Sequence, residues 1–421
     1  MVPTNRRIVF ATFGSLGDLH PYLALAIELK ARGQRPCIAT HPGYRARVEG
    51  EGVDFHAVRP DMGVFGEETA VMKDVMHAQR GPEFIIRRMF MPHLRDSAAD
   101  LAEALEGADL LVNHTLAFAG PLLAQKRGLP WVSTALAPLA FFSAHDPPIL
   151  APMPVLNRLR AFGPEFYGGF IKRLQGFCRG WTAPVRALRV ELGLPPSDLD
   201  PLFAGQFSPL GTLALFSGVM GQVQPDWPAR THITGFPFYD PEAEAGLAPE
   251  LAAFLDAGDP PIVFTLGSSA VLDAGDFFTQ SARAARQLGR RALLLIGRDP
   301  RNRPAGSLPP EILAVEYAPH GAVFRRAAAV VHQGGIGTTG QALRAGVPML
   351  CHPYGFDQPD NAARVVRLGI ARSIPRGTAR ALSGLLGDAT LLQRAEAIGR
   401  QVDAEEGVAT ACDLIEGWLG R

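Results

Sequence analysis

The sequence has few cysteines and no long hydrophobic run. Its four cysteines, Cys37, Cys178, Cys351 and Cys412, lie far apart, and none forms the C-x-x-C pair of a zinc or redox motif. No segment reaches 18 uninterrupted apolar residues, and the amino terminus has only a short apolar run before glycines and an acid. We therefore expect reduced thiols, no signal peptide, no membrane span and a cytoplasmic protein.

The chain also lacks net charge. Among 421 residues, 41 Lys and Arg balance 41 Asp and Glu. Domains that bind nucleic acid usually carry a basic excess, so we expect no nucleic-acid partner. The 11 histidines show no H-x-x-x-H spacing, and the D-x-D of Asp198 and Asp200 follows no apolar strand. We interpret that D-x-D as turn chemistry and expect no catalytic metal.

Short apolar segments alternate with helical segments in two parts of the chain. Residues 7–13 are typical of a strand, residues 14–18 of a glycine turn, and residues 19–33 of a helix that ends at Gly33. This alternation of strand-like and helical segments stops after residue 140 and resumes near residue 260. This pattern predicts an α/β protein with two doubly wound parallel sheets. We expect domains at 1–218 and 238–421, joined by a turn-rich linker at 219–237, with ligands at the carboxyl ends of the strands.

Residues 329–346, AVVHQGGIGTTGQALRAG, contain the pattern G-x-G-x-x-G. A strand, a glycine loop and a helix start would direct backbone amides and the helix dipole at an anion such as a diphosphate. A nicotinamide dinucleotide site would also need an acid at the end of the next strand, where VPMLCHP has none. We therefore expect a diphosphate that does not belong to a dinucleotide, with a nicotinamide enzyme as an alternative.

A longer stretch, residues 317–369, resembles the donor-binding signature of family 1 glycosyltransferases, the bacterial relatives of the UDP-glycosyltransferases. The resemblance extends to LGSS at residues 266–269 and to GSLGDLHPYLALA at the amino terminus. It is close to sterol, macrolide or polyketide and rhamnolipid-type enzymes. It implies the GT-B fold: an acceptor-binding domain facing a nucleotide-sugar-binding domain, with a C-terminal helix that packs back across them.

The resemblance implies a site for a UDP- or dTDP-hexose, a co-substrate, and no further cofactor. An aromatic ring would stack on the pyrimidine, the glycine loop and nearby hydroxyls would hold the diphosphate, and an acid with an amide would hold sugar hydroxyls. Gly340 departs from the pattern, because plant relatives often have a ribose-binding Glu there. The implied donor-binding residues are Ser268, Ser269, Tyr317, His320, His332, Gly334, Gly335, Gly337, Thr338, Thr339, Asp357 and Gln358.

The catalytic base of the family is usually a His three residues before a Pro. Here Asp18 stands three residues before Pro21, and His20 is the alternative. A well-placed carboxylate can accept the acceptor proton. Asp18 also lies where a helix N-cap belongs, so a purely structural role is open. The sequence names no partner acid for either residue.

The sequence indicates the acceptor contacts less clearly than the donor contacts. His114 ends a predicted strand, and Phe141 and Phe142 begin an aromatic segment that could line an apolar pocket or cover the domain core. Residues 155–190 carry seven basic residues and one acid, so they could touch an anionic membrane or form a solvated face.

Together these observations predict an inverting, metal-independent glycosyltransferase. It would move a hexose from a UDP- or dTDP-sugar to a hydroxyl of an apolar small molecule or lipid, such as a natural product, flavonoid, sterol, macrolide or hydroxy-fatty acid. Two further hypotheses are a sugar-nucleotide epimerase of the same fold and a non-catalytic nucleotide-sugar-binding protein.

Overall fold

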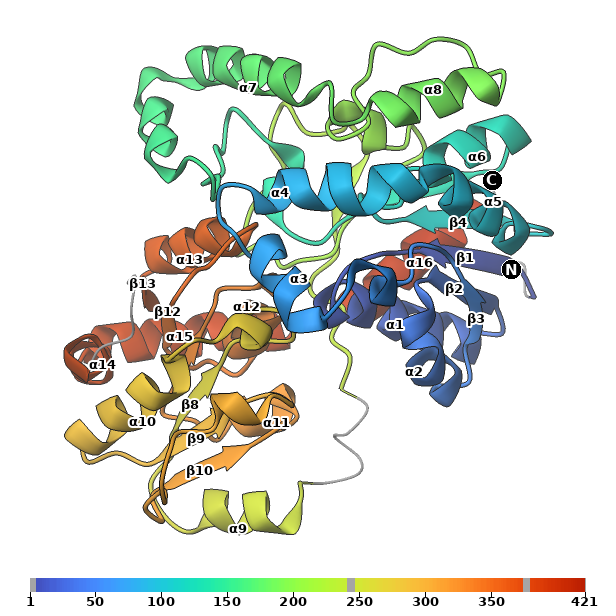
Figure 1. The fold of residues 1–421 in the computed structure, drawn as a ribbon. Helices are drawn as coiled ribbons and strands as arrows, with labels where there is room; N and C mark the ends of the chain where they lie inside the picture. The colour runs from blue at the N-terminus through green and yellow to red at the C-terminus, as the bar shows by residue number, and fades with distance from the viewer. Residues whose placement is uncertain (1–4, 241–246, 374–378, 421) are drawn as a thin grey trace.

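The computed structural model describes residues 5–240, 247–373 and 379–420, and it contains two parallel sheets with helices around them (Figure 1). The inner strands of the first sheet are mostly apolar and buried, as expected for strands covered on both faces, whereas its two edge strands are partly exposed. Its strand order is β3-β2-β1-β4-β5-β6-β7. Its strands are β1 Arg7–Ala11, β2 Arg35–Thr40, β3 Asp54–Ala57, β4 Leu110–Asn113, β5 Trp131–Ala135, β6 Thr212–Ala214 and β7 Thr231–Ile233.

The second sheet repeats this topology. Its order, β10-β9-β8-β11-β12-β13, matches the first six strands of the other sheet, and every described pairing is parallel. This repetition confirms the predicted pair of Rossmann-like sheets. Its strands are β8 Ile262–Thr265, β9 Ala292–Leu295, β10 Ile312–Val315, β11 Ala329–His332, β12 Met349–Cys351 and β13 Ala371–Ser373.

Helices connect the strands of each sheet and cover its faces (Figure 1). Those of the N-terminal part are α1 Leu16–Ala31, α2 Arg45–Gly50, α3 Glu68–Val75, α4 Gly81–Phe84, α5 Leu94–Ala104, α6 Gly120–Arg127, α7 Pro164–Cys178 and α8 Ala183–Glu191. Those of the C-terminal part are α9 Pro249–Asp256, α10 Phe277–Gln287, α11 His320–Phe324, α12 Ile336–Arg344, α13 Gln358–Arg367, α14 Ala379–Leu386, α15 Ala389–Asp403 and α16 Gly407–Leu419. In the described part of the chain, no helix has the length and apolarity needed to cross a membrane.

The predicted linker, residues 219–237, contains a strand that the sequence pattern does not reveal. Strand β7 pairs with β6, with Thr231 opposite Thr212, and so extends the first sheet. Strand β7 has only three residues and lies between turn-forming residues. It is therefore too short for an alternation of apolar and polar residues to be recognised. The first sheet therefore ends inside the predicted linker.

The C-terminal helix α16 packs back against α1 of the N-terminal domain, as the resemblance implied. Its buried face joins the core around α1, and Trp418 lies against Gly211, where an added Cβ would be 2.5 Å from the indole. Glu416 accepts from the side chains of Arg32 (3.1 Å) and Gln34 (2.8 Å). The end of the chain thus ties the two domains together.

Strand order reverses between β1 and β4 in the first sheet and between β8 and β11 in the second. Loops that follow such neighbouring strands diverge and leave room for ligands at the carboxyl edge. Ile336, at the start of α12, packs against core clusters of both domains, so the reversal point of the second sheet lies against the first domain.

Candidate active site

The loop after β1 begins helix α1 with a capping box. Ser15 is the N-cap, and its hydroxyl accepts from the Gly17 amide at 3.2 Å. Asp18 is the third residue of the helix, and its carboxylate accepts from the Ser15 amide at 2.7 Å. The prediction that Asp18 is the N-cap is therefore wrong, because the helix begins at Leu16. The sequence signal was the S-x-x-D spacing of a capping box.

One oxygen of Asp18 is committed to this loop, and the other faces a histidine. Oδ2 accepts from the Ser15 amide and hydroxyl, the latter at 3.0 Å. Gly14 permits this approach, because its φ is +129° and an added Cβ would lie 2.3 Å from Oδ2. Oδ1 lies 3.7 Å from Nε2 of His114. The Asp18 side chain keeps 30% of its surface exposed, so the carboxylate remains accessible to an acceptor.

His114 follows β4, directly beside the end of β1. It is buried, and Tyr22 packs edge-on against its ring. Burial lowers the pKa of His114, while the charge of Asp18 acts to raise it. The effect of burial is the larger of the two, so the folded protein favours the neutral ring. The sequence placed His114 among acceptor contacts and could not pair it with Asp18, 96 positions earlier.

His20, the alternative base, has different neighbours. Its ring centroid lies 4.9 Å from that of Tyr239, and its Nε2 lies 3.5 Å from the Arg47 guanidinium. Burial, followed by the positive charge of Arg47, lowers the pKa of His20 to about 4. The structure thus pairs Asp18 with His114 and turns His20 toward Tyr239 and Arg47.

The glycine loop after β11 leads into α12. Gly334 has φ +87°, and an added Cβ would lie 2.9 Å from the carbonyl oxygen of Gln358. Gly335 is the N-cap of α12, and the Thr339 amide bonds back to its carbonyl at 2.9 Å. The amides before Thr339 have no partner within the helix, and Gly337 has open space where a Cβ would point. This geometry suits an anion.

Two predicted diphosphate ligands lie inside the domain. His332 is fully buried; its Nδ1 accepts from the Gly334 amide at 3.1 Å and its Nε2 lies 3.8 Å from Cys351 Sγ. Burial lowers the pKa of His332 to about 3. Thr339 is also fully buried. Both side chains are therefore buried beside the loop, and their predicted contact with phosphate stays a prediction. His332 shapes the loop.

Gln333 is a residue that sequence reasoning missed. An added Cβ at Gly267 or at Gly335 would lie 2.4 Å or 2.7 Å from its Nε2. Its amide therefore fills the space between the loop after β8, which carries Ser268 and Ser269, and the glycine loop. No pattern in the sequence marks Gln333, because its role depends on β8 lying beside β11.

The start of α13 closes this side of the site. Asp357 Oδ2 accepts from Asn361 Nδ2 at 2.6 Å, and the same amide donates to Gly334 O at 3.0 Å. Gln358 Oε1 accepts from the backbone amides of residues 354 and 355. Burial raises the pKa of Asp357 to about 6, and the charge of Asp18 adds to this.

Both halves of the chain match known protein families. Residues 8–92 match the Glycosyltransferase family 28 N-terminal domain, and residues 293–405 match the Erythromycin biosynthesis protein CIII-like, C-terminal domain. The chain is 32% identical over 431 residues to the O-mycaminosyltylonolide 6-deoxyallosyltransferase of Streptomyces fradiae, across 98% of this chain and 97% of that protein. The chain belongs to the family 1 glycosyltransferases.

Other similar proteins are more distant from this glycosyltransferase. It is 28% identical over 432 residues to the sterol 3-beta-glucosyltransferase of Neurospora crassa, and the match covers 97% of this chain but 27% of that longer protein. The glycotransferase of kitacinnamycin has a TM-score of 0.67 at 24% identity, over 99% of this chain and 100% of that chain. The spinosyn rhamnosyltransferase complexed with thymidine diphosphate has a TM-score of 0.62 at 18% identity, over 97% and 100%.

These findings confirm that the protein is an enzyme, a hexosyltransferase, and that its fold is GT-B. They do not favour the epimerase hypothesis. The roles of the predicted donor and acceptor residues stay predictions. The structure of the glycosyltransferase shows where these residues lie.

The predicted nucleoside contacts lie around the start of α11. Tyr317 is 58% exposed, as a stacking surface requires. His320 stacks on Phe324, with ring centroids 4.6 Å apart, and burial lowers its pKa to about 4. Gly340 packs on Phe236, whose ring atoms would lie 3.0 Å from an added Cβ. A side chain at position 340 would require the Phe236 ring to shift in this glycosyltransferase.

The structure places Phe141, a predicted acceptor contact, in an aromatic cluster. Its ring stacks on Trp227, with centroids 3.9 Å apart, and on Phe207 at 5.5 Å, so it belongs to the core. Phe142 is less buried and packs edge-on against Phe203. The sequence showed aromatics in this segment but not which of them face inward.

A small apolar cavity of about 10 Å³ adjoins the Asp18 and His114 loops. Its lining includes Phe13, just before Gly14, and the segment 116–119, just after His114. That volume suits about one water molecule, so an organic acceptor would have to separate its walls.

Proposed function

We propose that this glycosyltransferase transfers a hexose from a UDP- or dTDP-sugar to a hydroxyl of an apolar small molecule, with inversion at the anomeric carbon. The observation that carries the proposal is the partly exposed carboxylate of Asp18 at the start of α1, together with the start of α12, whose Ile336 packs against the core cluster around α1. A base and an anion site then lie at one interface between the domains.

In this mechanism the acceptor hydroxyl gives its proton to Asp18 Oδ1 while its oxygen attacks the anomeric carbon. The bond from that carbon to the diphosphate breaks, and the electron pair leaves with the phosphate oxygen. Amides at the start of α12 stabilise the departing charge. Nε2 of His114 lies 3.7 Å from this oxygen, beyond hydrogen-bond distance, and is its polar neighbour on that side. Attack opposite the leaving group inverts the anomeric configuration.

We infer an acceptor of the macrolide or sterol kind. The support is the 32% identity to a 6-deoxyallosyltransferase whose name specifies a tylonolide, the weaker similarity to sterol glucosyltransferases, and the apolar lining beside Asp18. A panel of UDP- and dTDP-hexoses with macrolide, sterol, flavonoid and hydroxy-fatty-acid acceptors tests this. The expected result is an acceptor with added hexose or deoxyhexose mass, formed equally in EDTA. Donor left unconsumed with every acceptor would contradict the proposal, and activity that needs added manganese would contradict its metal independence.

The glycine loop should bind a pyrimidine diphosphate more tightly than a dinucleotide. The strand after α12, β12, ends at Cys351, so no acid follows it directly to bind an adenosine ribose. Calorimetric titration with UDP, dTDP and NAD measures the difference. Tighter binding of NAD than of either pyrimidine nucleotide would reject this prediction.

The donor step should depend on pH through Asp357. Its raised pKa, about 6, means that the free enzyme loses this carboxylate acceptor as the pH falls through 6. We expect kcat/KM for the donor to be constant above that value and to fall about tenfold per pH unit below it. Asp357→Asn should lower kcat/KM at pH 8 and abolish this dependence. An unchanged profile in the variant would assign the titration to another group.

We also propose that α7 and the segment before it contact an anionic membrane surface, where an apolar acceptor would concentrate. Phe162, Phe166 and Phe177 are 70%, 52% and 72% exposed, and α7 lies at the outer edge of the N-terminal domain (Figure 1). Exposed cations accompany them at Arg158, Arg160, Lys172, Arg173 and Arg179. Exposed aromatics with basic neighbours suit a negatively charged lipid interface.

Cosedimentation with vesicles tests this surface. The protein should bind phosphatidylglycerol vesicles and not phosphatidylcholine vesicles, and serine at all three phenylalanines should weaken binding about tenfold or more. Val64→Ser, which changes an exposed apolar residue elsewhere, is the control. Equal binding by the triple variant would mean that these aromatics form an ordinary solvated face.

A further inference from the structure

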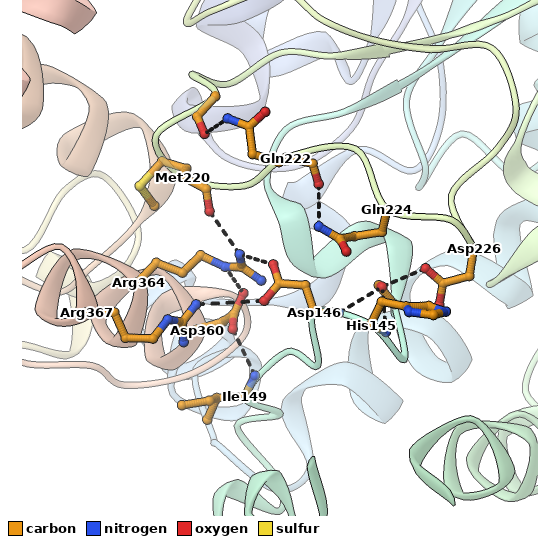
Figure 2. Close-up of polar contacts among 12 residues, drawn as sticks. His145, Asp146, Ile149, Met220, Gln222, Gln224, Asp226, Asp360, Arg364 and Arg367 are labelled. Atoms are coloured by element: carbon orange, nitrogen blue, oxygen red, sulfur yellow. Dashed lines mark hydrogen bonds and ion pairs between the residues drawn. The ribbon is translucent and has the colours of Figure 1, made fainter. Parts of the chain in front are cut away.

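A buried ionic network joins the two domains beside the proposed donor-sugar site (Figure 2). Its centre is Arg364 of α13, which is 3% exposed and pairs with the fully buried Asp360 one turn earlier, Nε to Oδ2 at 2.7 Å. The Nη1 atom of Arg364 forms the contacts with the other domain. It donates to Asp146 Oδ2 at 2.5 Å and to the Met220 carbonyl at 2.9 Å.

The N-terminal side of this network is itself well ordered by hydrogen bonds. The Ser143 hydroxyl accepts from the amides of His145 and Asp146, both at 3.1 Å, and donates to Asp226 at 2.7 Å. Asp226 also accepts from the amide of residue 144 at 2.6 Å. Asp146 therefore sits on a turn that is anchored to its own domain.

A second contact crosses the same interface. The Ile149 amide donates to Asp360 Oδ1 at 2.9 Å, so both oxygens of Asp360 are occupied, one by each domain. Arg367, one turn beyond Arg364, lies 3.9 Å from Asp146. Figure 2 shows the segment 145–149 lying along α13 through these contacts.

Burying charges this way adds little net stability, because desolvation offsets most of the attraction. Its distinctive effect is geometric, since a guanidinium with fixed donor directions accepts one arrangement of partners. The network therefore determines the register of α13 against residues 143–149 more than it determines how tightly the domains adhere.

The same helix begins with Gln358, and Asp357 precedes it. From Asp357 a chain of contacts runs through Asn361 to Gly334 of the glycine loop. A shift of α13 would thus move the donor-sugar contacts relative to Asp18, which is part of the N-terminal domain.

We propose that Arg364 is a positioning residue for transfer: through Asp146 and Asp360 it sets the start of α13, and so the donor sugar, in register with the acceptor domain. This inference rests on the proposed function, in which Asp357 and Gln358 hold the sugar. In that function all the proposed nucleotide contacts lie in the C-terminal domain together with α13, so we expect a change of register between the two domains to leave nucleotide affinity unchanged.

The test removes one carboxylate of this interface, that of Asp146, and leaves the contacts of Arg364 with the Met220 carbonyl and of Asp360 with the Ile149 amide in place. Arg364→Met would leave the buried Asp360 carboxylate without its cation and can prevent folding. Asp146→Ala is therefore the variant of choice, with Asp146→Glu as the conservative version. Asp403→Ala is the matched control, because it breaks the Arg325 pair within the C-terminal domain.

Asp146→Ala should lower kcat about ten- to a hundredfold, as expected for a small misplacement of the reacting groups. Calorimetry should show Kd for UDP or dTDP within about twofold of the unmodified protein, because the helix start and its amides remain in place.

Asp146→Glu should recover most of kcat, and Asp403→Ala should match the unmodified enzyme. Hydrogen exchange supplies a measurement independent of catalysis: the amides of residues 143–146 and of Ile149 should exchange faster in Asp146→Ala and not in Asp403→Ala. Unchanged kcat, or a nucleotide Kd weakened as much as kcat, would overturn the inference. If the unmodified protein transfers no sugar, the proposed function fails first. If it transfers sugar and Asp146→Ala does so equally well, only the positioning role fails.

Discussion

Asp18→Asn should reduce kcat for sugar transfer about a hundred- to ten-thousandfold, the usual cost of losing a general base. The amide cannot take the acceptor proton that we assign to Oδ1, opposite His114. Its carbonyl oxygen can still accept from the Ser15 amide and hydroxyl, so the capping box survives. We expect a stability loss of about 0.3–1 kcal/mol from removing a charge at a helix N-terminus, and an unchanged affinity for UDP or dTDP.

Single-turnover kinetics, thermal unfolding and calorimetry separate these effects. His20→Ala is the comparison, because its ring contacts Tyr239 and Arg47. It should keep turnover within a few-fold of the unmodified enzyme. Near-normal turnover in Asp18→Asn with loss in His20→Ala would identify His20 as the base and refute the pairing of Asp18 with His114.

Gly334→Ala should weaken UDP or dTDP binding about ten- to a hundredfold, equivalent to losing one or two charge-assisted hydrogen bonds. Its φ of +87° is strained for any other residue, and the new Cβ would lie 2.9 Å from the backbone of Gln358. To avoid that contact, the glycine loop or α13 must move. The amides at the start of α12 would then no longer point at the diphosphate.

Gly417→Ala is the matched control, because that helical glycine has nothing within 4 Å of an added Cβ. It should retain nucleotide affinity. Calorimetry on both variants, with circular dichroism to establish folding, checks the prediction. A folded Gly334→Ala protein with full affinity would show that the loop does not hold the diphosphate.

The succession of elements could be predicted from local pattern. Apolar runs such as residues 329–332 become buried strands whatever surrounds them, because both faces of a parallel sheet are covered. Gly334 and Gly335 marked the anion loop, since backbone conformation and helix starts are local properties. The resemblance across residues 317–369 indicated the family and the GT-B fold, and the comparisons confirmed both.

Side-chain direction was harder to predict. His332 and Thr339 lie in the right loop but point inward, and Phe141 belongs to the aromatic core. Composition identifies residue types able to bind a ligand, whereas their direction depends on packing against elements elsewhere in the chain.

The sequence by itself determined the two sheets, the glycine loop and the candidate carboxylate at position 18, because each depends on residues a few positions apart. Only the tertiary structure decided which groups meet. It brought His114 to Asp18 by placing β4 beside β1, and it set Gln333 between two loops by placing β11 beside β8. It also joined Arg364 to Asp146 across 218 positions. Such contacts arise from strand order and domain docking, whose energies are summed over many distant residues and leave no local pattern.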